Sequence, residues 1–197
     1  MITQTESYPA RLEIDYPEQL NRLTTLLRII WIIPILIILV LLTGGEEGVA
    51  AGLAIATALM IVVRQRYPRW WFDFSRELAR FEGRTTAYLA LLTDQFPSTV
   101  EEQSVHIEID YPDVEQDLNR WLPLVKWLLA IPHYIVLIVL ALFAVIAVIV
   151  SWFAILITGR YPRGLFDFVV GVMRWALRVQ AYAFLLVTDR YPPFRLS

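Results

Sequence analysis

The feature that most constrains this chain is that it repeats itself. Three segments of the first half return in the second half in the same order. The pairs are LEIDYPEQLNR at 12–22 with IEIDYPDVEQDLNR at 107–120, RYPRWWFDF at 66–74 with RYPRGLFDF at 160–168, and LLTDQFP at 91–97 with LVTDRYP at 186–192. This order predicts two copies of one structural unit. We place the copies at residues 1–98 and 105–197, joined by a polar linker at 99–104.

Long apolar runs lie between the first two motifs of each half. Hydrophobic residues make up 57% of the chain, which predicts a mainly α-helical membrane protein. The second run, 127–158, would form a helix of about 50 Å, whereas the hydrocarbon core of a bilayer is about 30 Å thick. A single span would also place the two RYPR motifs on opposite sides of the membrane. We therefore expect an apolar helical hairpin in each half, with the second turn near 143–147.

Helix boundaries and sidedness follow from the same pattern. The expected helices span about 20–42, 49–65 and 70–93 in the first copy, and about 114–142, 146–159 and 164–187 in the second. The first hairpin loop, TGGEEG at 43–48, carries two glutamates and no basic residue. The positive-inside bias therefore predicts a multi-pass protein with both termini and both RYPR motifs in the cytoplasm. A re-entrant hairpin predicts the same sidedness and stays open.

The last helix of each copy is predicted to be amphipathic. Its large apolar residues recur every three or four positions, and arginines follow at steps of four on another face. Such a helix suits the headgroup layer, where arginine meets lipid phosphate. Alternatively, the apolar stripe packs on the hairpins and the arginines are solvated or paired with Glu77. The candidate headgroup ligands here are Arg80, Arg84, Arg174 and Arg178.

Each RYPR motif is expected to mark the point where a hairpin leaves the bilayer. Proline turns the chain there, because it restricts its own backbone and that of the preceding residue. The tyrosine ring suits the acyl boundary, and the flanking arginines can reach phosphate oxygens. The predicted interface residues are Arg66, Tyr67, Arg69, Arg160, Tyr161 and Arg163.

Short strands are expected before each hairpin. ARLEIDYP at 10–17 and VHIEIDYP at 105–112 alternate apolar and polar residues and stop at Tyr-Pro. They predict a small cytoplasmic β-sheet that ties the two copies together. Pairing would gather four carboxylates, as a divalent-ion site requires, although a solvated strand face gives the same pattern. These carboxylates are Glu13, Asp15, Glu108 and Asp110.

His133 lies within the second apolar run, next to Tyr134. An ionisable residue at membrane depth is a candidate functional site, here an intramembrane polar site. In the alternative interpretation, a neutral imidazole is satisfied by a helix carbonyl. One histidine without a second ligand nearby cannot hold a metal ion.

Three stretches of the second half carry a family resemblance. They are VKWLLAIPHYIVL at 125–137, TGRYPRGLFDFVVGVMRW at 158–175 and TDRYPPF at 188–194. In these stretches the second half resembles DUF4389, a bacterial family of uncharacterised membrane proteins, and the first half resembles it more faintly. The first half departs at WIIPILI, 31–37, which lacks the His-Tyr pair. The resemblance implies a location in the bacterial cytoplasmic (inner) membrane and a repeated hairpin unit, and it supplies no activity.

Reactive groups are scarce in this sequence. It contains no cysteine and no pattern typical of a serine hydrolase, zinc protease or nucleotide site, so we predict no catalytic residues, metal or cofactor. A formal net charge of −2 argues against a nucleic-acid partner. We expect a scaffold or accessory subunit that packs against a larger membrane protein complex or forms a homo-oligomer. The alternatives are a protein that binds anionic lipids or shapes the membrane and, third, a small transporter or channel.

Overall fold

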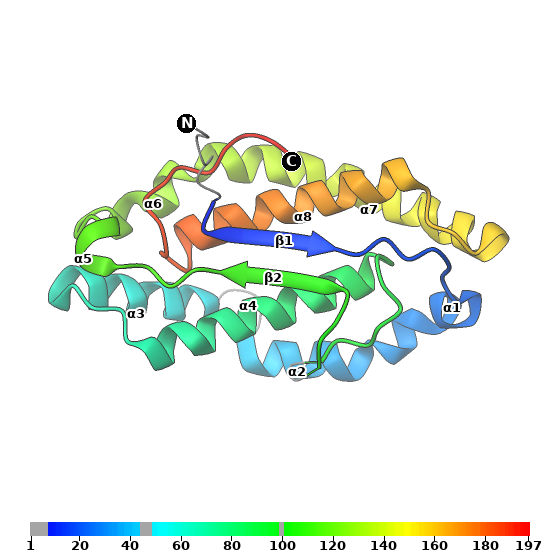
Figure 1. The fold of residues 1–197 in the computed structure, drawn as a ribbon, viewed down its shortest axis with the longest axis horizontal. Helices are drawn as coiled ribbons and strands as arrows, with labels where there is room; N and C mark the ends of the chain where they lie inside the picture. The colour runs from blue at the N-terminus through cyan, green and yellow to red at the C-terminus, as the bar shows by residue number, and fades with distance from the viewer. Residues whose placement is uncertain (1–7, 44–48, 99–100) are drawn as a thin grey trace, which may run out of the picture.

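The computed structural model describes residues 8–43, 49–98 and 101–197. The described part is mostly helical, and its one sheet is two-stranded, as the sequence predicts (Figure 1). In chain order the elements are β1 (Ala10–Ile14), α1 (Arg22–Trp31), α2 (Ile33–Thr43), α3 (Val49–Arg64), α4 (Arg69–Leu89), β2 (Val105–Ile109), α5 (Val114–Asp117), α6 (Pro123–Leu129), α7 (Ile131–Thr158) and α8 (Arg163–Ala183).

The sheet is built from one strand of each half. β1 and β2 pair antiparallel, with Leu12 opposite Ile107 and Arg11 opposite Glu108. Leu12 and Ile107 are buried, whereas Arg11 and Glu108 lie on the opposite face of the sheet, because side chains alternate along a strand. Both strands lie in front of α4 and α8 in Figure 1. β1 packs on α8 of the second half, and β2 packs on α4 of the first half, so the two halves are intertwined.

The predicted turn near 143–147 is wrong. α7 is one helix from Ile131 to Thr158. Residues 143–147, FAVIA, contain no glycine, proline or other turn former that would end it. The break comes earlier, at Ala130, where α6 ends and Pro132 occupies the first turn of α7, a position that tolerates proline.

The first half does not form a hairpin either. Figure 1 shows α1, α2 and α3 following one another along the long axis, while α4 runs back beside them. Ile35 of α2 packs in one cluster with Phe81 of α4. Further along, Trp71 Nε1 of α4 donates a hydrogen bond of 2.8 Å to Thr57 Oγ1 of α3. The amphipathic helix is thus the packing partner of the apolar helices. The predicted loop at 43–48 falls almost wholly on residues 44–48, which lie outside the described part of the chain.

The two RYPR motifs therefore lie at opposite ends of the long axis (Figure 1). The hydroxyl of Tyr67 in the first motif donates a hydrogen bond of 3.0 Å to the carbonyl oxygen of Leu185, just past the end of α8. The second motif precedes the start of α8, about 30 Å away along this helix. The expected placement of both motifs at one end of paired hairpins is wrong. Each run of apolar helices, α1–α3 in the first half and α6–α7 in the second, crosses the length of the molecule once; we call each run an apolar path.

Candidate membrane-facing site

The apolar helices expose much of their surface. On α7, Ile138 is 70% exposed and Ile157 is 75% exposed, and on α1, Ile29 is 75% exposed. Two helical stretches of the described chain, Arg22–Val40 and Ile131–Thr158, are long and apolar enough to cross a membrane. An apolar surface of this extent marks contact with lipid or with another protein.

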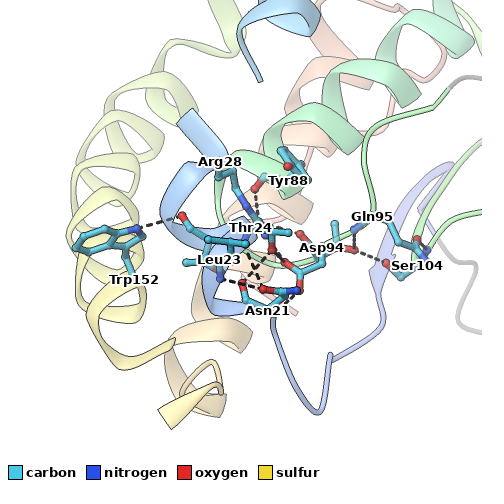
Figure 2. A network of polar contacts seen from close by, with 11 residues as sticks. Asn21, Leu23, Thr24, Arg28, Tyr88, Asp94, Gln95, Ser104 and Trp152 are labelled. Atoms are coloured by element: carbon cyan, nitrogen blue, oxygen red, sulfur yellow. Dashed lines mark hydrogen bonds and ion pairs between the residues drawn. The ribbon is translucent and has the colours of Figure 1, made fainter. Parts of the chain in front are cut away.

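A buried arginine fixes the start of the apolar path in the first half. Arg28 on α1 is 2% exposed, and its Nη1 donates to the carbonyl oxygens of Tyr88, at 2.7 Å, and Thr93, at 2.9 Å. Its Nη2 forms an ion pair with Asp94 (Figure 2). The Asp94 carboxylate also accepts the amide of Asn21, the N-cap residue of α1, at 2.7 Å. This network ties α1 to the segment that follows α4.

The second half repeats this arrangement with a lysine. Lys126 on α6 is buried, with its Nζ 2.7 Å from Asp189 Oδ1 and 2.8 Å from the carbonyl oxygen of Thr188. Asp189 also accepts the amide of Asn119. We call Arg28–Asp94 and Lys126–Asp189 the buried clamps. Neither cation was among the predicted site residues, although one signal could have found them: in both halves the cation stands seven residues after the asparagine.

The stripe arginines of α4 and α8 have protein partners. Each donates to a backbone carbonyl oxygen of a strand or of the segment that follows its own helix. The contacts are Arg80 Nε to Ile107 at 2.9 Å, Arg174 Nε to Leu12 at 3.0 Å, Arg178 Nη2 to Ser197 at 2.8 Å, and Arg84 Nη1 to Ser98. Arg80 Nη1 also lies 2.8 Å from Glu77, as the alternative interpretation predicts. Arg80 and Arg174 therefore join the two halves, whereas Arg84 and Arg178 hold the segment that follows their own helix.

The RYPR tyrosines are core residues. Tyr67 is 2% exposed and Tyr161 is 1% exposed, so their expected position at the acyl boundary is wrong. Burial raises the pKa of Tyr67 to about 12. The hydroxyl of Tyr111 donates to the carbonyl oxygen of Tyr67, and that of Tyr16 donates to the carbonyl oxygen of Tyr161. The DYP tyrosine of each half thus holds the RYPR motif of the other half, which turns both motifs inward.

The RYPR arginines remain at the surface, at the two ends of the molecule. The guanidinium carbon of Arg69 lies 4.5 Å from the ring centre of Tyr111, and that of Arg163 lies 3.8 Å from the ring centre of Tyr16. Arg160 is exposed.

An open cleft of about 980 Å³ lies at the first of these ends. We call it the RYPR cleft. Its lining comprises Leu59, Met60 and Val63 of α3, the residues Arg64 to Arg69, and the segment from Tyr111 to Glu115. Arginine side chains and an apolar helix wall meet there, which suits a ligand with an anionic group and a hydrocarbon part.

His133 is buried in an aromatic box. Its Nδ1 accepts a hydrogen bond of 3.0 Å from Trp175 Nε1, and its ring stacks on Phe194 with ring centres 4.0 Å apart. The ring centre of Tyr191 lies 4.7 Å from that of His133. Among the described residues, no three His, Asp or Glu side chains gather as a metal site would require. His133 packs α7 against α8 and the C-terminal segment.

Tyr134 lines a different cavity, of about 470 Å³, between α4 and α8. Gln180 Nε2 donates a hydrogen bond of 3.0 Å to Glu82 Oε2 at this cavity. Burial raises the pKa of Glu82, and the hydrogen bond from Gln180 partly opposes this shift. Leu12 of β1 and Leu137 of α7 line the same cavity.

Three of the four strand carboxylates contact a basic side chain. Arg11 Nη2 lies 3.0 Å from Glu108 and 3.1 Å from Asp110, and Asp15 lies 3.3 Å from His106. The Arg11 guanidinium thus stands between Glu108 and Asp110. The arrangement fits the solvated strand face that the sequence allowed as an alternative.

Comparison with curated proteins and with solved structures found no match. The family described as "Domain of unknown function (DUF4389)" matches residues 22–101 and again 121–195. Each matched stretch runs from the start of an apolar path, through its clamp cation and RYPR motif, to the segment after the amphipathic helix. The chain therefore belongs to the DUF4389 family and carries two tandem matches to its domain.

Proposed function

We propose that this protein is a non-catalytic structural scaffold of the bacterial cytoplasmic membrane. Its apolar helices α1–α3 and α7 lie in one leaflet, parallel to the membrane plane, and its sheet stays in water. The observation that supports this proposal is that, along the long axis, the charged sheet lies within the length of α7 rather than beyond its ends (Figure 1).

The position of the sheet follows from two residues, one in the middle of β1 and one just after it. Leu12 of β1 shares a cavity wall with Leu137 of α7. Tyr16, four residues later, donates to the carbonyl oxygen of Tyr161, which follows the end of α7. The charged residues between these two points, Glu13 and Asp15, therefore lie beside the length of α7.

An upright α7 would carry these charges into the bilayer. At about 1.5 Å per residue α7 is about 42 Å long, so a perpendicular helix would fill the whole hydrocarbon thickness. The sheet beside it exposes Glu13 and Asp15 together with the ion pairs of Arg11. Each charged side chain at the bilayer centre costs at least about 2.5–3.5 kcal/mol. An α7 that lies flat avoids this cost and still buries its apolar face.

The flat orientation also gives the two RYPR ends equivalent surroundings. Both ends of the long axis then lie at the same membrane surface, so Arg66 and Arg160 reach the headgroups of one leaflet. Trp70 and Trp121 are exposed at the first end, and tryptophan favours this interface. The positive-inside bias favours the cytoplasmic leaflet, with both termini in the cytoplasm.

The depth profile of α7 tests this proposal. Because the chain has no cysteine, single cysteines at Ile135, Leu142, Ile146 and Phe153, all exposed on one face of α7, can each carry a nitroxide. In reconstituted bilayers we expect all four labels at one depth, with high accessibility to oxygen and low accessibility to a water-soluble nickel chelate. A label at Glu13 serves as the water-exposed control. A depth that peaks near Leu142 and Ile146 and falls toward both other positions would show an upright helix and overturn the proposal.

A further inference from the structure

The RYPR cleft holds three arginines without an ionic partner. Within the part of the chain that the structure describes, no carboxylate lies within ion-pairing distance of Arg64, Arg66 or Arg69. The opposite wall contains two acidic residues, Asp113 and Glu115, and the Asp113 carboxylate caps α5 by accepting the amides of Glu115 and Gln116. The arginine further along α4 differs: Arg76 pairs with both Asp73 and Glu77.

The cleft opens onto an apolar wall. Leu59 and Val63 line it and are exposed, and they belong to the outer face of α3. This face continues into the apolar surface that the flat orientation buries in lipid. A bound molecule could therefore place an anionic group at the arginines and hydrocarbon against α3.

The second copy lacks this combination. At the matching positions Thr158 and Gly159 replace Arg64 and Gln65. The second RYPR end thus keeps Arg160 and Arg163 but has no cation on the last turn of its apolar helix. This difference supplies an internal control.

We propose that the RYPR cleft binds the phosphate group of an acidic phospholipid, whose acyl chains lie along Leu59 and Val63. Guanidinium groups match phosphate oxygens with paired hydrogen bonds, and no carboxylate of the described residues forms an ion pair with these three arginines. The apolar wall selects a lipid over a soluble phosphate, because a soluble anion would use the arginines and leave the wall bare. This inference rests on the proposed function in one respect: a leaflet must reach the cleft.

Native mass spectrometry of the full chain in mild detergent tests the cleft itself. Phosphatidylglycerol and phosphatidylcholine are added in equal amounts, and the single-lipid adducts are compared. We expect the wild type to hold phosphatidylglycerol about tenfold more than phosphatidylcholine, and the Arg64→Gln/Arg66→Gln variant to bring the ratio close to one. The variant Arg190→Gln/Arg195→Gln removes the same charge from exposed positions of the C-terminal segment and should keep the ratio.

Three outcomes would overturn the inference. A wild type without a preference would do so, and so would a control variant that loses the preference as fully as the cleft variant. Inorganic phosphate that removes the preference, where chloride of equal ionic strength does not, would identify a soluble phosphate as the ligand. Detergent imposes no membrane plane, so the loss of lipid preference would not change the expected depth profile of α7. In the same way, an upright α7 would not change the expected lipid ratio.

Discussion

The Nε of Arg174 donates a hydrogen bond of 3.0 Å to the carbonyl oxygen of Leu12, which joins α8 to β1 across 162 residues of sequence. Arg80 makes the matching contact with Ile107 of β2. Each amphipathic helix therefore rests against the strand of the other half. The two sequence repeats are copies in sequence, but in space they form one interlocked unit.

We predict that neither half folds alone. A fragment of residues 1–98 lacks β2 and leaves the sheet-facing side of α4 uncovered, and residues 105–197 lack β1 in the same way. Each fragment in mild detergent should show no cooperative thermal transition by circular dichroism. Mixing the two fragments should restore the transition. A fragment that melts cooperatively by itself would show that the halves are separable domains.

Loss of the aspartate charge in either buried clamp should strongly lower the free energy of unfolding. Asp94→Asn leaves the Arg28 charge buried without its counter-charge, and the free energy of unfolding should fall by about 3 kcal/mol. Asp189→Asn should act in the same way on Lys126. The control is Asp73→Asn, which breaks a more exposed pair with Arg76 and should cost less than about 1 kcal/mol. Equal losses in denaturant unfolding for clamp and control would contradict this role.

Two glycines of α8 should respond oppositely to alanine. A Cβ at Gly171 would lie 2.8 Å from the Leu196 Cβ and 3.0 Å from its carbonyl oxygen, so Gly171→Ala should destabilise the protein by about 1–3 kcal/mol. Gly164 has no such neighbour within 4 Å, and Gly164→Ala should be neutral or stabilise by up to about 1 kcal/mol. Thermal unfolding compares the two variants. Similar shifts would exclude the close crossing of the C-terminal segment over Gly171.

Glu82 should make stability depend on pH. Burial raises the pKa of Glu82 above its usual value of 4.5, so the folded state favours the protonated form. The folded state of the wild type therefore loses stability as the pH rises from 4.5 through the raised pKa, whereas Glu82→Gln avoids this loss. In denaturant unfolding, the free energy of unfolding of the variant should equal that of the wild type at about pH 4 and exceed it at about pH 7. The control Glu18→Gln, at an exposed site, should show no such difference. If the wild type were more stable than Glu82→Gln at neutral pH, a raised pKa of Glu82 would be refuted.

Local signals predicted the amphipathic helices and the sheet. Steps of three and four among the apolar residues predicted helices at 70–93 and 164–187, and the structure has Arg69–Leu89 and Arg163–Ala183. Alternation over a few residues predicted both strands, and they pair as expected. These patterns are readable because each depends on residues close together in the sequence.

The path of the apolar helices could not be predicted from local signals. Near identity of the RYPR motifs suggests that both lie at one end of the molecule, but the mutual packing of the two copies places them at opposite ends (Figure 1). A spacing of four puts Arg80 and Arg84 on one helix face without identifying the neighbour, which is a strand of the other half for Arg80. The Asp94 partner of Arg28 is likewise 66 residues away.

The most direct test of the flat orientation is the sidedness of Arg66 and Arg160. The chain contains no cysteine, so Arg66→Cys and Arg160→Cys can each be labelled in sealed membrane vesicles with an impermeant maleimide. Because the long axis lies parallel to the membrane, both positions should react from the cytoplasmic face and neither from the opposite face. Reaction of the two positions from different faces would show that α7 crosses the bilayer and would contradict the account.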